Sequence, residues 1–464
     1  MSTYWLALVG AVYFVALVIA TWSARRATHG ESDYMLAGSN LGAALGCLTF
    51  GATLFSTFTL MGMPDFFRTH GVGAWIFLGV ADAAVAFVIL WYAAHLRRAA
   101  STVDFKGIAG LISARYRSRA AGYLYLAGLF VFLIPYVAVQ IRGIGILLNA
   151  AYPQTLPIWA WSLAIVVTLL IYSEIGGLKA IIYSDALQGL VLLVVTWLIA
   201  YGCVKEFGGI AALMQQIDAT EPALLSVPGP HGLFTFQFML ASLLAILALP
   251  ITQPQLATRL VIMKNTTEAK RMAVAVGVFS MLVIVPTIAI GLHGAIAYRG
   301  ADTAAFLAAA LIHDQAPYIA AIVAVGLVAA AMSTADSQLF ALGGELRSLL
   351  RADEPRAMRW TRTAIALFAA AAYGFAIMSA DQLVLMARVS FAGTAMLAPL
   401  ILTGVLSRSA KATYLLPATV VGLLVFLLSV LGLIPATIGG LRLDLALFAL
   451  LSLIALAGQR RAIA

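Results

Sequence analysis

Long apolar runs recur from one end of this 464-residue chain to the other, and they constrain its fold more than any other feature. Apolar residues make up 63% of the chain and charged residues only 10%. A run of roughly 18 or more apolar residues without strand-like alternation predicts a helix that crosses a membrane and satisfies its own backbone groups. The pattern excludes a string of soluble domains and predicts an all-α integral membrane protein.

We predict thirteen spans from the apolar runs that charged residues, proline and glycine separate. They lie near residues 4–22, 42–63, 73–96, 121–148, 157–173, 180–203, 234–253, 271–298, 317–349, 359–379, 383–406, 412–432 and 440–459. No loop between them is long enough to fold as a soluble domain. We therefore expect residues 1–464 to form a single membrane transport domain.

Lysine and arginine gather in alternate loops, which predicts the orientation of the chain. The predicted inner loops hold Arg97 and Arg98, and later Arg259 and Lys264, among other basic residues. Because cytoplasmic loops carry the excess of positive charge, we expect the N-terminus outside and the C-terminus in the cytoplasm. The net charge of +9 follows from these loops and does not indicate a nucleic-acid partner. The short loops favour a multi-pass protein of a plasma membrane, specifically a bacterial inner membrane.

One predicted span contains an unusual number of hydroxyl groups. The stretch Gly51–Gly62 carries Thr53, Ser56, Thr57 and Thr59. An unpartnered hydroxyl in hydrocarbon costs on the order of 1–3 kcal/mol, so these groups indicate a cavity, an ion or a neighbouring helix. We expect the flanking glycines to let the helix unwind, which would add free carbonyl groups. The alternative is that the hydroxyls bond back to their own helix, and the stretch alone leaves both interpretations open.

After the loop residues are assigned, we expect four charged residues deep within predicted spans: Asp82, Arg142, Asp336 and Arg388. Ionisable groups at this depth usually face the bundle interior and mark a pathway, although structural ion pairs are an alternative. Arg388 lies close to the outer end of its span, so it fits either a vestibule or a side chain that reaches to the interface.

The sequence carries no catalytic motif. It contains no glycine-rich phosphate loop, no Ser-His-Asp set and no cofactor fingerprint, and its six histidines lack metal-ligand spacing. We therefore predict that the protein is not an enzyme, has no catalytic residues and needs no cofactor beyond a coupling ion.

Several motifs resemble those of the sodium:solute symporter family. The most specific are Gly176–Ala180 and the pair Asp185 and Gln188. Further matches follow in order along nearly the whole chain: Leu60–Gly62, Asp104-Phe105 with Arg115-Tyr116, Gln253–Gln255 with Arg259, and Met332–Thr334. The stretch Leu60–Gly73 is similar to pantothenate and monocarboxylate carriers.

This resemblance implies a LeuT-type fold of about thirteen transmembrane helices, in which two inverted five-helix repeats enclose the binding sites. The repeats would be residues 42–203 and 234–406, with peripheral helices in 1–41 and 407–464. Helices 2 and 7, which begin the two repeats, would be broken. Gly51 and Gly62 in the first, and Pro250 and Pro254 in the second, agree with that expectation.

The resemblance also implies a sodium site. Its ligands would be the carbonyls of Ala52, Phe55 and Ala330 and the hydroxyls of Ser333 and Thr334. Neutral oxygen ligands suit a monovalent cation that must also leave. Asp185 would be a nearby charge that attracts the ion or controls its exit.

The predicted substrate site combines residues of four spans. They are Ser56, Thr57, Phe58, Thr59, Gln140, Arg142, Thr252, Gln253, Ser390 and Phe391. Arg142 can hold a carboxylate with two hydrogen bonds, so we expect a small organic anion. An amino acid or a sugar is the alternative. Leu54 stands where proline-carrying members of the family have an aspartate, which disfavours proline.

The expected function is therefore sodium-coupled symport of a small-molecule solute. Two alternatives stay open: a proton-coupled or uncoupled carrier with Asp82 and Asp336 as proton sites, and a transport-like solute sensor. Membrane lipid is a further expected partner, because the basic inner loop at residues 97–122 is typical of a helix that lies on anionic headgroups. The sequence gives no prediction of the oligomeric state.

Overall fold

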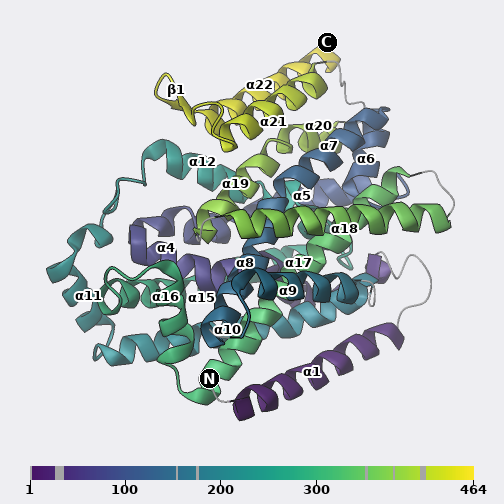
Figure 1. The fold of residues 1–464 in the computed structure, drawn as a ribbon. Coiled ribbons are helices and arrows are strands. Elements are labelled where there is room, and N and C mark those ends of the chain that lie inside the picture. The colour runs from purple at the N-terminus through teal and green to yellow at the C-terminus, as the bar shows by residue number, and fades with distance from the viewer. Residues whose placement is uncertain are drawn as a thin grey trace.

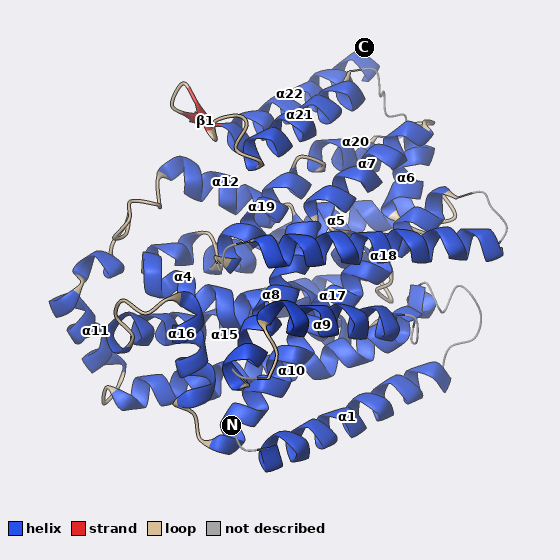
Figure 2. Cartoon of the chain, viewed as in Figure 1, coloured by secondary structure: helices blue, strands red, loops and turns tan. Residues whose placement is uncertain are grey.

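The computed structural model describes residues 3–26, 36–152, 155–173, 177–350, 354–379, 382–407 and 414–463. Almost all of this part is helical, and its one sheet is the hairpin of β1 (Thr437–Ile438) and β2 (Leu441–Arg442) (Figure 2). The motif residues Glu174–Gly176 lie outside the described residues. The all-α prediction is confirmed.

Eight helical segments of the described chain are long and apolar enough to cross a membrane. They are formed by α1 (Thr3–Arg26), η3 (Val72–Ile76) with α5 (Gly79–Ala100), α7 (Arg119–Phe132) with α8 (Ile134–Ala151), α10 (Gly177–Glu206), α15 (Thr266–Ala297), α17 (Pro317–Leu349), α18 (Glu354–Met378), and α19 (Leu383–Ala395) with α20 (Ala398–Leu406). A ninth is the bent pair of α3 (Ala43–Leu54) with the segment Phe58–His70.

Shorter apolar helices fill the remaining predicted spans. They are α9 (Ile158–Ser173), α12 (Phe236–Leu247), α21 (Leu415–Val430) and α22 (Leu443–Ile463). Each predicted span therefore coincides with a helix, but the number thirteen stays a prediction. The long α17 is continuous.

The connections carry the other short elements. These are η1 (Ala37–Ser39), α6 (Ile108–Arg115), α11 (Ile210–Thr220), η4 (Pro222–Leu225), α16 (Thr303–Ala308) and η5 (Ala309–His313). Figure 1 shows α1 along one edge of the molecule and α21 with α22 along the opposite edge. Helices α8 and α17 lie between these edges, where they contact each other.

The first predicted helix break is confirmed. Helix α3 ends at Leu54, Phe55 is extended (φ −100°, ψ 127°), and η2 (Phe58–Gly62) and α4 (Met63–His70) continue at an angle of 59°. The bend follows from local capping, because the Ser56 N–H donates to Thr59 Oγ1 (3.2 Å) and the Thr59 N–H donates to the Ser56 carbonyl (2.8 Å). Polar side chains thus hold the unwound residues.

The flanking glycines have a different role from the one we expected. Gly51 lies inside α3, and a Cβ added there would be 2.6 Å from the ring of Phe279 in α15. Gly62 lies inside η2, where an added Cβ would come within 3.3 Å of Leu383 and Val384. Both glycines permit close helix packing, whereas the unwinding occurs at residues 55–57.

The second break separates α13 (Leu249–Thr252) from α14 (Pro254–Val261). Gln253 between them is extended (φ −92°, ψ 118°), and Pro254 opens α14. Proline has no N–H to donate and disfavours a helical residue before it, which favours a break at this place. Both broken helices lie where the sequence predicted them.

A carboxylate fixes the start of the short helix α6 to α17. Glu345 of α17 is buried and accepts from the N–H groups of Ile108 (2.9 Å) and Ala109 (2.5 Å). The next N–H, of Gly110, donates to Ser348 Oγ (2.9 Å). These bonds satisfy three of the N–H groups that a helix start leaves without intrahelical partners.

Gly143 in α8 packs directly against the first break, which generates a test of the packing. A Cβ added there would lie 2.0 Å from Thr57 Cγ2 and 3.3 Å from Met61 Sδ. We expect Gly143→Ala to lower the free energy of unfolding by about 1–3 kcal/mol through overpacking. The thermal midpoint of the purified protein in detergent measures this loss.

The matched control is Gly374→Ala in α18, where an added Cβ meets nothing within 4 Å. Alanine is the better helix former, so this variant should keep or raise the midpoint. Equal midpoints for the two variants would show that α8 does not pack against the break as described.

Candidate functional site

The first break frees backbone carbonyls inside the bundle. In an unbroken helix the N–H groups of Ser56 and Thr59 would donate to the carbonyls of Ala52 and Phe55. Both N–H groups are turned to other acceptors at the break. The carbonyl of Leu54 is satisfied differently, because it accepts from the hydroxyl of Tyr136 in α8 (2.9 Å).

Two hydroxyls of α17 face these carbonyls. Ser333 Oγ lies 3.1 Å from the Ala52 carbonyl oxygen and 2.9 Å from that of Ala330. Thr334 Oγ1 lies 3.3 Å from the Ala52 oxygen and 3.4 Å from that of Thr53. All five residues are buried. The structure thus brings together Ala52, Ala330, Ser333 and Thr334, and it adds the Thr53 carbonyl, which the sequence did not single out.

Phe55, whose carbonyl is the remaining predicted ligand, is the extended residue of the same break. The set consists of neutral oxygens, which are ligands for hard cations of low charge. A hydroxyl that now donates to a carbonyl can rotate and present a lone pair to an ion. Chemically, the cluster can hold a sodium ion.

The predicted nearby charge, Asp185, is part of a buried ion pair. Its Oδ2 lies 2.5 Å from Arg259 Nη2, and both side chains are at most 1% exposed. Thr49 joins them, because its hydroxyl accepts from Arg259 Nε (2.9 Å) and donates to Asp185 (2.8 Å). Arg259 Nη2 also donates to Ser337 Oγ (2.9 Å). The network connects α3, α10, α14 and α17.

The structure corrects the placement of Arg259. The sequence put it in an inner loop, yet it is one of the largest fully buried side chains. An arginine can be buried this completely because a carboxylate and several acceptors replace its water. Ser337 lies one helical turn from Ser333, so the ion pair is adjacent to the candidate cation site.

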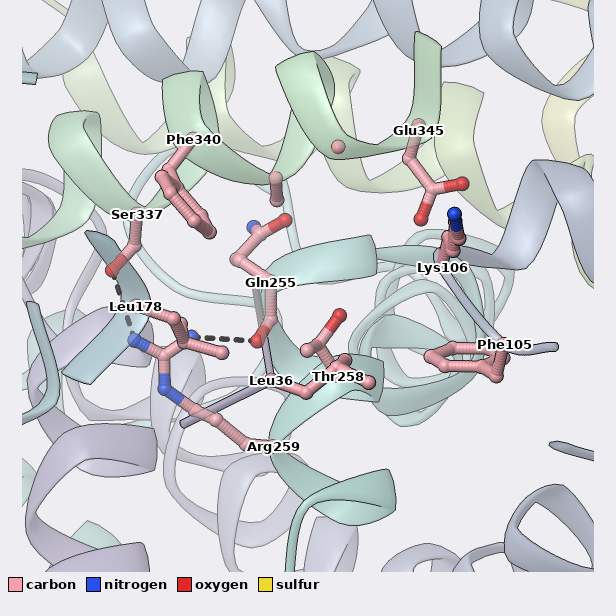
Figure 3. A pocket seen from close by; sticks show the side chains of 13 residues that line it. Leu36, Phe105, Lys106, Leu178, Gln255, Thr258, Arg259, Ser337, Phe340 and Glu345 are labelled. Carbon is pink, nitrogen blue, oxygen red and sulfur yellow. Dashed lines mark hydrogen bonds between the residues drawn. The ribbon is translucent and has the colours of Figure 1, made fainter. Parts of the chain in front are cut away.

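A pocket with about 20 Å³ of free space for a water-sized molecule lies beyond this ion pair (Figure 3). Figure 3 shows Arg259, Ser337 and Gln255 at one side of the pocket and Lys106 and Glu345 at the other. Lys106 belongs to a loop that the charge distribution predicts to be cytoplasmic. The Asp185–Arg259 pair therefore separates the candidate cation site from a pocket on the predicted inner side.

Some predicted substrate residues are buried with polar atoms left over. Thr57 Oγ1, Gln140 Oε1, Gln253 Nε2 and Ser390 Oγ have no hydrogen-bond partner within the described residues. Each of these side chains is at most 1% exposed. A buried unsatisfied polar group costs about 1–3 kcal/mol, so these atoms are candidates to meet a polar solute or water.

An aromatic cluster connects the elements that carry these residues. The ring centroids of Phe58 and Phe391 are 6.0 Å apart, and those of Tyr136 and Phe391 are 4.9 Å apart. Gln140 Nε2 donates to the Tyr136 carbonyl one turn earlier in α8 (3.2 Å). Residues of η2, α8 and α19 thus meet beside the break.

Other predicted substrate residues serve the local backbone. Ser56 Oγ accepts from the Phe58 N–H, and Thr59 Oγ1 accepts from the Ser56 N–H. Thr252 Oγ1 donates to the Ala248 carbonyl of the same broken segment. These hydroxyls shape the two breaks.

Arg142 is half-buried in α8, two residues after Gln140. Because a helix turns about 100° per residue, the two side chains leave α8 about 200° apart. They do not share a face of the helix. The role of Arg142 in binding a solute stays a prediction.

The sequence did not predict the roles of three residues: Tyr136, Arg259 and Asp444. Tyr136 gave no signal as a single tyrosine in an apolar run, and Arg259 was taken for a loop residue. Asp444, which binds Arg388 in the structure, was not noticed within the last span. A signal for Asp444 was present, since an acidic residue at the start of an apolar run is a candidate partner for a membrane-embedded arginine.

The comparison structures share this architecture. A Na+-coupled sialic acid symporter, solved in its substrate-bound outward-open state, is similar over 98% of this chain and 97% of its own, with a TM-score of 0.78 and 17% sequence identity. The nucleobase-cation-symport-1 family transporter MHP1 is similar over 93% and 95%, with a TM-score of 0.56 and 15% identity. These likenesses establish the LeuT-type fold.

Similarity to the curated relatives covers a smaller share of each chain. The sodium/pantothenate symporter of Escherichia coli (strain K12) is 24% identical over 285 residues, which are 60% of this chain and 57% of that protein. The high-affinity proline transporter PutP of Bacillus subtilis (strain 168) is 25% identical over 71% of this chain and 70% of its own. The chain spans 57% and 63% of the two sodium/pantothenate symporters that it matches.

The model of the sodium:solute symporter family, a family of membrane transporters, matches residues 34–408. Those residues include both broken helices, the hydroxyls of α17 and the Asp185–Arg259 pair. Since the match covers most of the chain, the protein belongs to the sodium:solute symporter family.

Proposed function

We propose that this protein is a sodium-coupled secondary symporter that imports a small organic solute, most favourably a carboxylate. The observation that carries the proposal is the convergence of Ser333 and Thr334 on the carbonyl of Ala52. An ion bound there would join the broken helix to α17. It would therefore favour conformations in which the two elements lie together, which is how a ligand shifts a conformational equilibrium.

The energy for import would come from the ion. One positive charge that crosses the membrane inward gains roughly 2.3 kcal/mol per 100 mV, before any concentration gradient. Sodium is a co-substrate in this scheme and no resident cofactor is needed. We propose the carbonyls of Ala52, Phe55 and Ala330 with the hydroxyls of Ser333 and Thr334 as its ligands.

We assign the Asp185–Arg259 pair as the inner gate of the ion. It lies between the proposed ligands and the pocket at Gln255 and Glu345. Sodium released inward would pass this pair. Thr53 Oγ1 lies 3.3 Å from Asp185 and would be an intermediate ligand between the proposed sodium site and the ion pair. Opening requires that α14, which carries Arg259, moves relative to α10.

For the solute, we propose a chamber at Thr57, Gln140, Gln253 and Ser390, with Phe58 and Phe391 as its wall. Two relatives support an acid, since the pantothenate of one and the sialic acid of the other both carry a carboxylate. An amino acid is the second candidate, because other relatives are named proline transporters. Leu54 in the break weighs against proline itself.

We further propose two inverted repeats at residues 42–203 and 234–406, with the remaining helices peripheral. Two observations support this division: each proposed repeat begins with a broken helix, and α1 lies at an edge of the molecule (Figure 1). The protein is a multi-pass membrane protein with bacterial relatives, and we propose an outer N-terminus in a bacterial inner membrane.

The sodium site makes a direct prediction. The native protein should gain thermal stability in sodium but not in potassium at equal ionic strength. A free ion at a hundred times its dissociation constant stabilises by roughly 2.7 kcal/mol. In the double variant Ser333→Ala with Thr334→Ala, we expect the apparent sodium affinity to fall at least tenfold, as read from midpoints across a sodium titration.

Thr196→Ala is the matched control, because this buried hydroxyl donates only within its own helix, to Leu192 and Leu193. It should leave the sodium response intact. An unchanged sodium titration in the double variant would reject the proposed ion site. Equal responses to sodium and potassium in the native protein would favour the proton-coupled or uncoupled carrier.

The inner gate predicts a strong coupling between two buried charges. Arg259→Met leaves Asp185 buried without its partner, which we expect to cost about 3–5 kcal/mol of unfolding free energy. Adding Asp185→Asn should recover part of the loss, since no charge is then left unpaired. A double-mutant cycle on denaturant unfolding in detergent measures the coupling.

For comparison, Arg271 pairs with Glu268 at the surface and its side chain is 70% exposed. Arg271→Met should change stability by less than about 1 kcal/mol. If Arg259→Met proves as mild as Arg271→Met, the gate is not closed by this ion pair.

A further inference from the structure

Arg388 of α19 lies almost buried beside the proposed chamber, with its guanidinium group held from three sides. Its Nε donates to Ser242 Oγ (2.7 Å), and its Nη2 donates to Asp444 Oδ2 (2.6 Å). Its Cζ lies 4.6 Å from the centre of the Phe238 ring. The side chain is 11% exposed. This is a preorganised group, because helices α12 and α22 fix the orientation of the fork.

The guanidinium group of Arg388 has N–H donors that are not used within the described chain. A guanidinium group has five N–H donors, and within the described chain those of Nη1 have no acceptor. Ser242 has no hydrogen-bond donor left, because its hydroxyl donates to the Phe238 carbonyl (2.7 Å) while it accepts from Arg388. A further acceptor at this place would bind to Arg388.

The charges around Arg388 do not balance. Asp444 also accepts from Arg442, at 3.1 Å from Nε and 3.0 Å from Nη2. In the part of the chain that the structure describes, two guanidinium groups therefore share one carboxylate. A positive charge at this depth is costly unless an anion accompanies it. An anionic ligand would restore the balance.

A pocket with about 10 Å³ of free space for a water-sized molecule adjoins the guanidinium group. Apart from Arg388 and Ser242 its lining is apolar: Phe58, Phe77, Leu78, Ala245, Ile246, Val384 and Phe391. Phe58 and Phe391 are also the wall of the proposed chamber, so the pocket and the chamber share one aromatic surface. Its apolar lining and single charged group suit an anion with an apolar body.

We infer that Arg388 holds the carboxylate of the transported solute, and that the solute class is a small monocarboxylate with an apolar or aromatic body. The inference rests on the proposed symport function and names its substrate. The carboxylate would accept two hydrogen bonds from the guanidinium fork. The apolar body would lie against Phe58 and Phe391, towards Gln140 and Ser390.

The test measures ligand affinity from thermal midpoints of the purified protein in sodium. The probes are two acids of this class, each with its neutral partner: benzoate with benzamide, and butyrate with butyramide. In the native protein we expect at least one acid to stabilise and its neutral partner to fail. Arg388→Gln should weaken binding of that acid at least tenfold while stabilisation by sodium alone persists.

Three further variants separate ligand binding from structural support. Asp444→Asn removes the competing carboxylate, so it should tighten acid binding. Arg442→Gln removes a guanidinium group that shares Asp444 but does not line the pocket. It leaves Asp444 to Arg388 alone, so the affinity for the acid should fall, but less than in Arg388→Gln. Arg142→Gln tests the other arginine and should leave the acid bound.

Any of three results would overturn the inference. The first is an equal loss of acid binding in Arg388→Gln and Asp444→Asn, and the second is a loss of acid binding in Arg142→Gln while Arg388→Gln still binds the acid. The third is that neither acid stabilises the native protein. If Arg388→Gln fails to fold, tighter binding in Asp444→Asn supports the inference and weaker binding rejects it. An Arg388-dependent acid response without any sodium response would reject the symport function and leave the carboxylate site standing.

Discussion

The structure depends on backbone carbonyls that lose their helical donors at residues 52–55. Hydrocarbon offers no water to such groups, so a break at this depth persists only where other groups satisfy it. Tyr136 covers the Leu54 carbonyl, and Ser333 and Thr334 cover that of Ala52. The same groups that stabilise the break thus compose the candidate ion site, and stability and function here rest on one set of contacts.

The positions of the spans and breaks could be predicted because they follow from local chemistry. Apolar length sets a membrane helix, and Pro254 favours the second break because it lacks an N–H and restricts Gln253 before it. The mechanism of the first break was less accessible. Its cause is the exchange of hydrogen bonds between Ser56 and Thr59, whereas Gly51 and Gly62 accommodate neighbouring helices. A glycine near a break looks the same in a sequence for either reason.

The candidate site was predictable where a motif carried it and hidden where a tertiary contact made it. Ser333 and Thr334 follow from the family resemblance. The burial of Arg259 depends on Asp185, which lies 74 residues earlier in the chain. Arg259 belongs to a motif of the family resemblance, but its local sequence does not predict that it is buried. Arg142 and Gln140 were both expected at the substrate site, but their spacing of two residues places them on different faces of a regular helix, and the role of Arg142 stays a prediction.

Helix α17 runs without interruption from the ion ligands to Glu345, which holds the first N–H groups of α6. The twelve residues from Ser333 to Glu345 span about 18 Å at 1.5 Å per residue. Helix α17 thus carries the proposed cation ligands near its middle, and the start of α6 is hydrogen-bonded close to its C-terminal end. While those bonds hold, any displacement of α17 at the ion site is carried to the mouth of the inner pocket without an intervening hinge.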